Sequence, residues 1–227
     1  MNLVIFHGIQ VIVRTLFGYH AHKVSVDILN FFLLRCFNLL GSRIQFNNNF
    51  DLPTDRPLII VANHQNTADI PPLIWYLRKH HLKFVSKKEL GKGIPSVSYH
   101  LRNGGSALID RNDPIQAVEE INRHAALLAK NNWSTLIFPE GTRSKNGVPK
   151  KFKTRGIKTI IEKTHNVLIV PITINNSWKF NRWGKFPLPL GIKITFYVHE
   201  PVEPADDLST AFFDAIEKTI TDAVVLD

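Results

Sequence analysis

Apolar positions along the chain fall into two repeating patterns. Short runs of Ile, Val, Leu and Phe alternate with longer stretches in which apolar residues recur every three or four positions. The short runs are typical of buried strands and the longer stretches of amphipathic helices. Strands are expected at residues 57–63, 82–86, 106–110, 134–140, 167–174 and 192–198, and helices at 70–80, 114–131, 154–165 and from about Pro204, with a loop-broken helical stretch at 88–105. This alternation predicts an α/β domain with a central, mostly parallel mixed sheet flanked by helices.

The first 45 residues follow a different pattern. Two helices are expected, at residues 3–17 and 24–40, and both are apolar over most of their circumference. Their polar residues fall on narrow stripes: His7, Gln10 and Arg14 on the first helix, and Asp27, Asn30, Arg35 and Asn38 on the second. Such helices are too apolar for an ordinary solvent-facing surface. We interpret residues 1–45 as a membrane-associating helical hairpin and residues 46–227 as the α/β domain.

The hairpin is expected to lie in, or enter, one leaflet of a membrane. Its first apolar run is about 15 residues long, whereas a bilayer core takes about 20 helical residues. A signal peptide fits poorly, since no basic residue precedes the run and no small-x-small cleavage site follows it. The alternative is a pair of core helices in a soluble domain.

Composition and charge narrow the possible partners. The chain has 227 residues, 44% of them hydrophobic and 21% charged, which is typical of a globular protein. A single cysteine, Cys36, excludes an internal disulfide and a thiolate zinc cluster. Residues 78–163 carry 18 Lys and Arg against 7 Asp and Glu, while residues 200–227 carry 8 acids and one base. A basic face of this kind suits nucleic acid, a phospholipid surface or a phosphorylated small molecule, or it is simply solvated.

The segment IIVANHQNTADIPPL, residues 59–73, places His64 and Asp69 five positions apart. On a continuous helix they would point about 140° apart, so they meet only if the backbone bends between them. A carboxylate on one imidazole nitrogen fixes the tautomer and makes the other nitrogen a general base. The alternative is a histidine that caps local structure. A metal site is not expected, because no third ligand has suitable spacing.

Two further strand ends carry phosphate-binding side chains. FPEGTRSKNG, residues 138–147, brings Glu140 and Arg143 to one turn, and SALIDR, residues 106–111, ends in Asp110 and Arg111. A guanidinium binds a phosphate through two parallel hydrogen bonds, and Glu140 is expected to orient Arg143 or to bind an acceptor hydroxyl. The alternatives are a solvated turn and a simple pair of Asp110 with Arg111. Neither a Gly-x-Ser-x-Gly elbow nor a cysteine near a base occurs, which favours direct transfer to a substrate hydroxyl.

These segments together resemble the motifs of the glycerophospholipid acyltransferase family, most closely its 1-acyl-sn-glycerol-3-phosphate acyltransferases. Four blocks carry the resemblance, in the family's order: NHQNTAD at 63–69, residues 105–111, FPEGTRS at 138–144 and VPI at 170–172, with a basic-glycine step at 153–156. One residue departs from the pattern: Asn66 stands where many relatives carry serine. Asparagine also forms local hydrogen bonds, so we expect little change there.

The resemblance implies a reaction and a set of roles. His64 would deprotonate the sn-2 hydroxyl of lysophosphatidate, Asp69 would orient His64, and the alkoxide would attack the thioester of acyl-CoA or acyl carrier protein. The expected substrate-binding residues are Asn63, Arg111, Glu140, Gly141, Thr142 and Arg143. No metal or other cofactor is implied, and the expected partners are a phospholipid membrane surface, a lysophospholipid acceptor and the acyl donor, with no nucleic acid.

Three alternatives accompany this interpretation. The acceptor is glycerol 3-phosphate or another lysolipid, or the protein binds lipid without catalysis, or it binds nucleic acid. The last would leave the apolar hairpin and the FPEGTRS block unexplained. For the main interpretation we expect a peripheral or monotopic protein on the cytoplasmic face of a bacterial inner membrane.

Overall fold

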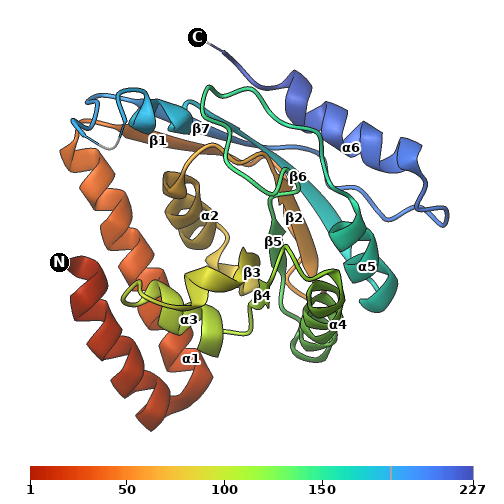
Figure 1. Cartoon of the computed structure of the whole chain (residues 1–227), viewed down its shortest axis with the longest axis horizontal. Helices are drawn as coiled ribbons and strands as arrows, with labels where there is room; N and C mark the ends of the chain where they lie inside the picture. The colour runs from red at the N-terminus through yellow and green to blue at the C-terminus, as the bar shows by residue number, and fades with distance from the viewer. Residues whose placement is uncertain (185, 227) are drawn as a thin grey trace.

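A seven-stranded sheet forms the centre of the computed structural model, which describes residues 1–184 and 186–226 (Figure 1). The strands are β1 (Arg43–Asn47), β2 (Leu58–Ala62), β3 (Lys83–Lys87), β4 (Ala107–Ile109), β5 (Thr135–Ile137), β6 (Leu168–Asn175) and β7 (Lys193–Val198). Their order in the sheet is β1-β7-β6-β2-β5-β3-β4, and every pair is parallel except β6 with β7. The predicted mostly parallel mixed sheet is therefore confirmed.

Helices cover both faces of the sheet. The long helix α1 (Asn2–Leu39), α2 (Ile70–Tyr76) and α3 (Val97–Asn103) lie on one side, and α4 (Pro114–Asn131), α5 (Arg155–Lys163) and α6 (Thr210–Asp222) on the other (Figure 1). β2 shows why its sequence is a continuous apolar run: Leu58 and Ile60 pack into the core on the α2 side, and Ile59 and Val61 into the core on the α4 side. A strand buried on both faces needs apolar residues at every position.

The structure differs from the expected elements in two places. The strand β1 was not predicted, because its sequence RIQFN lies where the hairpin was expected to give way to a loop, and it pairs with β7. The expected domain boundary at residue 45 therefore falls inside a strand of the sheet. The last helix begins at Thr210 and not near Pro204, where the Ser209 side chain accepts a hydrogen bond from the backbone of Phe212.

The N-terminal helix α1 is bent into the predicted hairpin. Gly18 has φ 76° and ψ −161°, a conformation that breaks the helix and that glycine adopts without strain. The two halves lie side by side (Figure 1), with Phe6 and Phe32 in contact at 5.9 Å between ring centroids. By length and composition α1 is apolar enough to cross a membrane, and only 11% of its most apolar stretch is buried.

The polar stripes of the hairpin face the body of the protein. Gln10 and Asn30 are buried, and His7 Nδ1 accepts a hydrogen bond of 3.2 Å from the backbone of Ser96. The opposite faces carry exposed apolar side chains: Val4, Ile5, Ile9, Val11, Ile12, Leu16, Phe17, Val24, Ile28, Phe32 and Leu39. The hairpin thus buries Gln10, Asp27 and Asn30 together with Val26, Leu29 and Leu34, and it presents a mainly apolar outer face, with Arg35 and Asn38 also exposed near its end.

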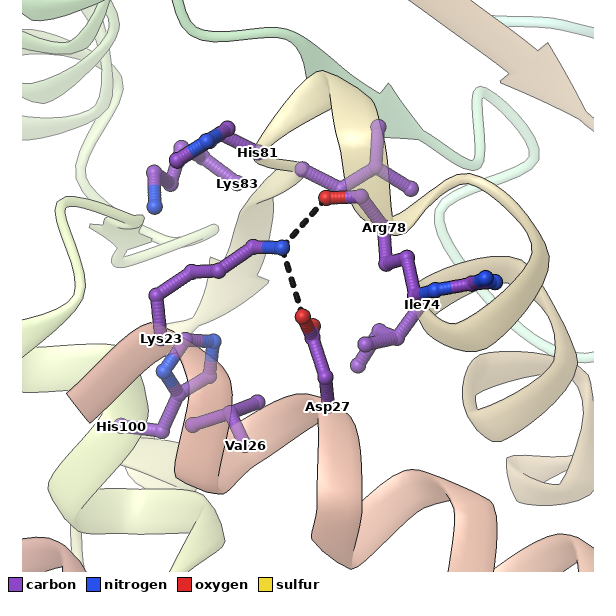
Figure 2. Close-up of a pocket in the computed structure, with 9 residues that line it drawn as sticks. Lys23, Val26, Asp27, Ile74, Arg78, His81, Lys83 and His100 are labelled. Carbon is purple, nitrogen blue, oxygen red and sulfur yellow. Dashed lines mark hydrogen bonds and ion pairs between the residues drawn. The ribbon is translucent and has the colours of Figure 1, made fainter. Parts of the chain in front are cut away.

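A cluster of charged groups joins the second half of α1 to the body. Lys23 bonds to Asp27 at 2.6 Å and donates to the backbone carbonyl of Arg78, beside a cavity of about 20 Å³ (Figure 2). Deeper in, Lys83 donates to the Tyr19 hydroxyl at 2.6 Å, and its ammonium lies 4.2 Å from the ring centroid of Trp133. Burial lowers the pKa of Lys83 to about 7. Burial therefore disfavours the charged form of this lysine, which lies next to Tyr19 at the bend of the hairpin.

Candidate active site

His64 and Asp69 meet in a bend between β2 and α2. His64 Nδ1 lies 2.8 Å from Asp69 Oδ2. The backbone is extended at Asn66 and then forms a 3-10 turn, η1 (Thr67–Asp69), whose first N–H groups are capped by the Asn66 side chain. The bend that the five-residue spacing required is therefore present, and Asn66 forms the local hydrogen bond expected of it.

Asp69 is a fully buried carboxylate with a complete set of donors. Its Oδ2 also accepts from the backbone N–H groups of Gln65 at 2.8 Å and Asn66 at 2.9 Å, and its Oδ1 accepts from the Ser177 hydroxyl. Such donors stabilise the charged form of a carboxyl group. Ser177 lies 108 residues from Asp69 in the sequence, so no spacing pattern pointed to it.

The His64 ring is held flat against Phe138, with 3.9 Å between centroids and 13° between planes. With Asp69 accepting from Nδ1, the proton of the neutral imidazole resides on Nδ1 and the lone pair on Nε2. Within the described residues, Nε2 makes no hydrogen bond, and the side chain is 17% exposed. The arrangement leaves one nitrogen free to take a proton from a substrate.

Asn63 and Gln65 fix the backbone on either side of His64. The Asn63 amide bonds to both the N–H and the carbonyl of Ile174 on β6, at 2.7 and 2.8 Å. Gln65 Oε1 accepts from the backbone of Ser177 at 3.1 Å, at the start of the 3-10 helix η4 (Ser177–Asn181). In this structure both polar atoms of the Asn63 amide bond to the backbone of β6, so the side chain positions the loop that carries His64.

Glu140 ties two of the three predicted segments together. Its Oε1 accepts from the backbone of His64 at 2.7 Å and its Oε2 from the backbone of Lys150 at 2.9 Å. Burial raises the pKa of Glu140, against the opposing effect of these two donors. Within the described residues Glu140 forms no ion pair with Arg143, so the expected orientation of Arg143 by Glu140 is not seen.

A cationic rim lies beside His64. Arg143 Nη1 donates to Thr67 Oγ1 at 2.9 Å, which brings the guanidinium onto the loop between His64 and Asp69. Lys150 Nζ donates to Thr142 Oγ1 at 2.6 Å and was not singled out from the sequence, where it is one of many lysines. Gly141 has φ 71°, and a Cβ there would meet only the end of Lys153, so backbone conformation and not space calls for glycine.

Arg111 lies farther along the sheet. It follows β4, the edge strand, and β3 separates β4 from β5, the strand that leads to Arg143. Adjacent strands are about 4.8 Å apart, so the two strand ends are separated by about 10 Å. The Arg111 side chain is exposed and makes no hydrogen bond with the described residues. The structure thus places Arg143 at the His64 loop and leaves Arg111 at the outer end of the same edge.

An apolar cavity of about 430 Å³ reaches the His64 loop from the hairpin. Asn66, Thr67 and Ala68 line it at one side. Both halves of α1 contribute to it through Leu3, Gln10, Val26, Leu29, Asn30, Leu33 and Phe37, followed by Leu40 just after the helix. Its lining is overwhelmingly apolar, which suits a hydrocarbon chain.

Comparisons with known proteins point to one family. The family model described as Acyltransferase matches residues 43–175. A 1-acyl-sn-glycerol-3-phosphate acyltransferase of Helicobacter pylori is 34% identical over 181 residues, which cover 78% of this chain and 71% of that protein. The chloroplastic enzyme LPAT1 of Arabidopsis thaliana is 33% identical over 153 residues, which cover 67% of this chain and 41% of that protein.

A solved structure shares the fold along almost the whole chain. The 1-acyl-sn-glycerophosphate (LPA) acyltransferase PlsC of Thermotoga maritima superposes with a TM-score of 0.77 at 24% identity, covering 97% of this chain and 87% of that one. The chain spans less than half the length of the plant relatives, 41% for Arabidopsis and 44% for Cocos nucifera. The family match spans 133 residues from 43 to 175, more than half of the chain, and the chain belongs to the acyltransferase family.

Proposed function

We propose that the protein transfers a fatty acyl group from an acyl thioester to the sn-2 hydroxyl of 1-acyl-sn-glycerol-3-phosphate, forming phosphatidate. The observation that carries the proposal is the 2.8 Å contact of His64 Nδ1 with buried Asp69, which leaves Nε2 without a hydrogen-bond partner among the described residues. The same loop lines the apolar cavity through Asn66, Thr67 and Ala68. The Helicobacter and Arabidopsis relatives are named as 1-acyl-sn-glycerol-3-phosphate acyltransferases, which supports this acceptor and this class of reaction.

In the proposed mechanism His64 acts as the base. Nε2 takes the proton of the sn-2 hydroxyl as its oxygen attacks the thioester carbonyl, and Asp69 stabilises the imidazolium that forms. The tetrahedral intermediate collapses by breaking the carbon–sulfur bond, and the thiolate leaves with the proton from His64. The products are the new ester and a free thiol, with no covalent acyl-enzyme intermediate.

The cationic rim is proposed to hold the acceptor phosphate. Arg143 offers a guanidinium at the His64 loop, where it donates to Thr67. Lys150 donates to Thr142, the residue that precedes Arg143. Two cations on one phosphate provide charge-assisted hydrogen bonds that also fix its orientation. By resemblance to the family Arg111 joins them, which requires its exposed side chain to reach inward from the end of β4.

The hairpin is proposed to hold the enzyme on one leaflet, on the cytoplasmic face of a bacterial inner membrane. Its outward apolar face is buried in the acyl region, and the cavity beneath it takes an acyl chain. The thioester arrives as acyl-CoA or acyl carrier protein and is consumed as a substrate. No cofactor takes part in the proposed mechanism.

The test is a panel of acceptors and donors on the purified enzyme with membrane lipid, read by product mass. Lysophosphatidate with an acyl thioester is expected to give phosphatidate, and His64→Ala to lose at least about 100-fold of the rate. His165→Ala, a change at an exposed histidine after α5, is the matched control and is expected to keep full activity. Full turnover by His64→Ala would overturn the mechanism. Turnover only with another acceptor would replace lysophosphatidate, and no turnover with any pair would favour lipid binding without catalysis.

A further inference from the structure

The loop between η4 and β7 exposes large apolar side chains. Trp183, Phe186, Leu188 and Leu190 lie within eight residues of one another, and Phe186 and Leu190 are 84% and 73% exposed. Elsewhere in the described α/β body the exposed apolar residues are single, as Ile115 is, or form pairs, as Leu90 with Ile94 and Val225 with Leu226 do. Single exposed apolar side chains are ordinary, but a contiguous group marks a contact surface.

The same stretch is strongly basic. Residues 177–193 contain Lys179, Arg182, Lys185 and Lys193 and no acidic residue. The Arg182 guanidinium lies 5.3 Å from the ring centroid of Trp183. Aromatic side chains next to cations are typical of segments that sit at a membrane interface, where the rings enter the head-group region and the cations meet anionic phosphates.

The loop is continuous with the hairpin. The backbone N–H of Gly191 donates to the carbonyl of Leu40 at 3.0 Å, and the Phe180 ring contacts Phe37 with 5.3 Å between centroids. Leu188 lines the same apolar cavity as Leu3 at the start of α1. In Figure 1 the segment before β7 accordingly lies next to the end of α1 that leads into β1. The loop therefore extends the apolar surface of the hairpin onto the α/β body.

We propose that this loop, residues 182–190, is a second membrane contact that inserts its apolar side chains into a bilayer containing anionic phospholipids. The hairpin and the loop then stand on two sides of the cavity that reaches the His64 loop. In this arrangement the cavity would open to the leaflet between two membrane contacts. The loop would also fix the rotation of the body on the membrane, which a single hairpin leaves free.

A fluorescent label tests the insertion directly. In a Cys36→Ser background, which removes the protein's only cysteine, Phe186→Cys is labelled with an environment-sensitive nitrobenzoxadiazole dye. The control is Thr219→Cys, an exposed position on α6 on the other side of the sheet. Vesicles of phosphatidylcholine with phosphatidylglycerol are added to the full chain. The account expects a blue shift and a rise in emission at position 186 and none at 219.

Each other outcome contradicts the proposal. An unchanged emission at 186 while the protein sediments with the vesicles would show that the loop stays in water. A concentration-dependent change at 186 without vesicles would show that a second copy covers the loop. Because these signals do not depend on turnover, they fail separately from the enzymatic proposal.

A matched pair of substitutions measures the contribution of the loop. Leu190→Ser and Ile115→Ser remove side chains that are 73% and 74% exposed, and Ile115 lies on α4, across the sheet from the hairpin. Leu190→Ser is expected to weaken vesicle binding about tenfold and Ile115→Ser to leave it unchanged. Equal binding by the two variants would overturn the proposal.

Discussion

The hairpin and the α/β body arrange their apolar and polar side chains in opposite ways. In the body, all five residues of β2 are buried and the charged side chains lie mostly outside. In the hairpin, Gln10 and Asp27 are buried, while Leu16 and Phe17 are exposed. One chain thus contains a region built for water and a region whose outer face is built for a less polar medium.

This difference suggests that the body and the hairpin have separate roles. The body supplies rigid strand ends on which His64, Asp69 and Arg143 converge. The hairpin supplies the exposed apolar face for which we propose contact with a lipid phase. It joins the body through polar groups such as Lys23, which pairs with Asp27 on the same helix and donates to the backbone carbonyl of Arg78 (Figure 2). Because the apolar face of α1 is directed outward, the body gains little core from that face. Four experiments test this comparison, from the largest expected effect to the smallest.

Asp69→Asn tests the body's chemistry and is expected to lower kcat by about 10²- to 10⁴-fold. The amide oxygen still accepts from His64, Gln65 and Asn66, and the amide nitrogen faces the Ser177 hydroxyl, so the geometry is kept while the charge is lost. Rates of phosphatidate formation give the effect, with the melting temperature as control. A variant of normal rate and normal stability would show that the carboxylate does not support His64.

The triple change Ile12→Ser, Leu16→Ser and Phe17→Ser tests the hairpin's outer face. Each exposed side chain that enters the bilayer contributes about 1.5–3 kcal/mol, so vesicle binding is expected to fall at least about 100-fold. Thermal unfolding in buffer should stay near that of the unmodified protein, since these residues contact little of the body. Sedimentation with vesicles measures the binding. Unchanged sedimentation would remove the basis for calling this face a membrane surface.

Two Leu→Ala changes within α1 separate its inner from its outer face. Leu34 is buried and Leu16 is exposed, although both belong to the same apolar helix. Leu34→Ala is expected to lower the free energy of unfolding in buffer by about 2–5 kcal/mol, and Leu16→Ala by less than about 0.5 kcal/mol. Urea titration gives both values. Similar losses for the two variants would mean that the hairpin has no outer face.

Lys83→Met tests the polar contact between the hairpin and the body, where Lys83 donates to the Tyr19 hydroxyl. Since the pKa of Lys83 is about 7 when folded and 10.5 in its ordinary state, the unfolded chain binds more protons between these values. The stability of the wild type should therefore rise from pH 7 to pH 10, and Lys83→Met should lack that rise and be more stable at pH 7 by ~1–3 kcal/mol. Lys87→Met, at the other end of β3, is the control. If stability changed with pH in the same way for the wild type and Lys83→Met, burial of the Lys83 ammonium would not be destabilising as we propose.

Sequence periodicity sufficed for most of the fold, since strands buried on both faces and an amphipathic α4 leave strong local patterns. It missed β1, because a polar edge strand such as RIQFN has only two apolar residues and gains its stability from pairing with β7. The N-terminal hairpin could be predicted because its two helices are apolar except for narrow polar stripes, a pattern unlike that of the helices in the body. That the stripes face the body follows only from contacts such as that of His7 with Ser96.

Within the site, the sequence pointed to the residues for which we propose a chemical role and not to those that hold them in place. His64 and Asp69 were predicted because their five-residue spacing and polar surroundings are unusual after a buried strand. Ser177 was not, since it lies 108 residues from Asp69 in the sequence, and Lys150 was not, since it is one of many lysines in a basic segment. Glu140 was expected to orient Arg143 or to bind an acceptor hydroxyl; in the structure its oxygens accept from two backbone groups, a contact that the sequence did not indicate.

The most direct test of the division of work compares turnover on two physical forms of one substrate. Phosphatidate formation is measured for the wild type and for the Ile12, Leu16 and Phe17 triple-serine variant. One acceptor is long-chain lysophosphatidate held in vesicles, and the other is a short-chain lysophosphatidate dissolved as monomers. The account predicts that the variant loses turnover on vesicles and keeps it on the dissolved acceptor. Equal rates on vesicles, or loss on both acceptors, would contradict it.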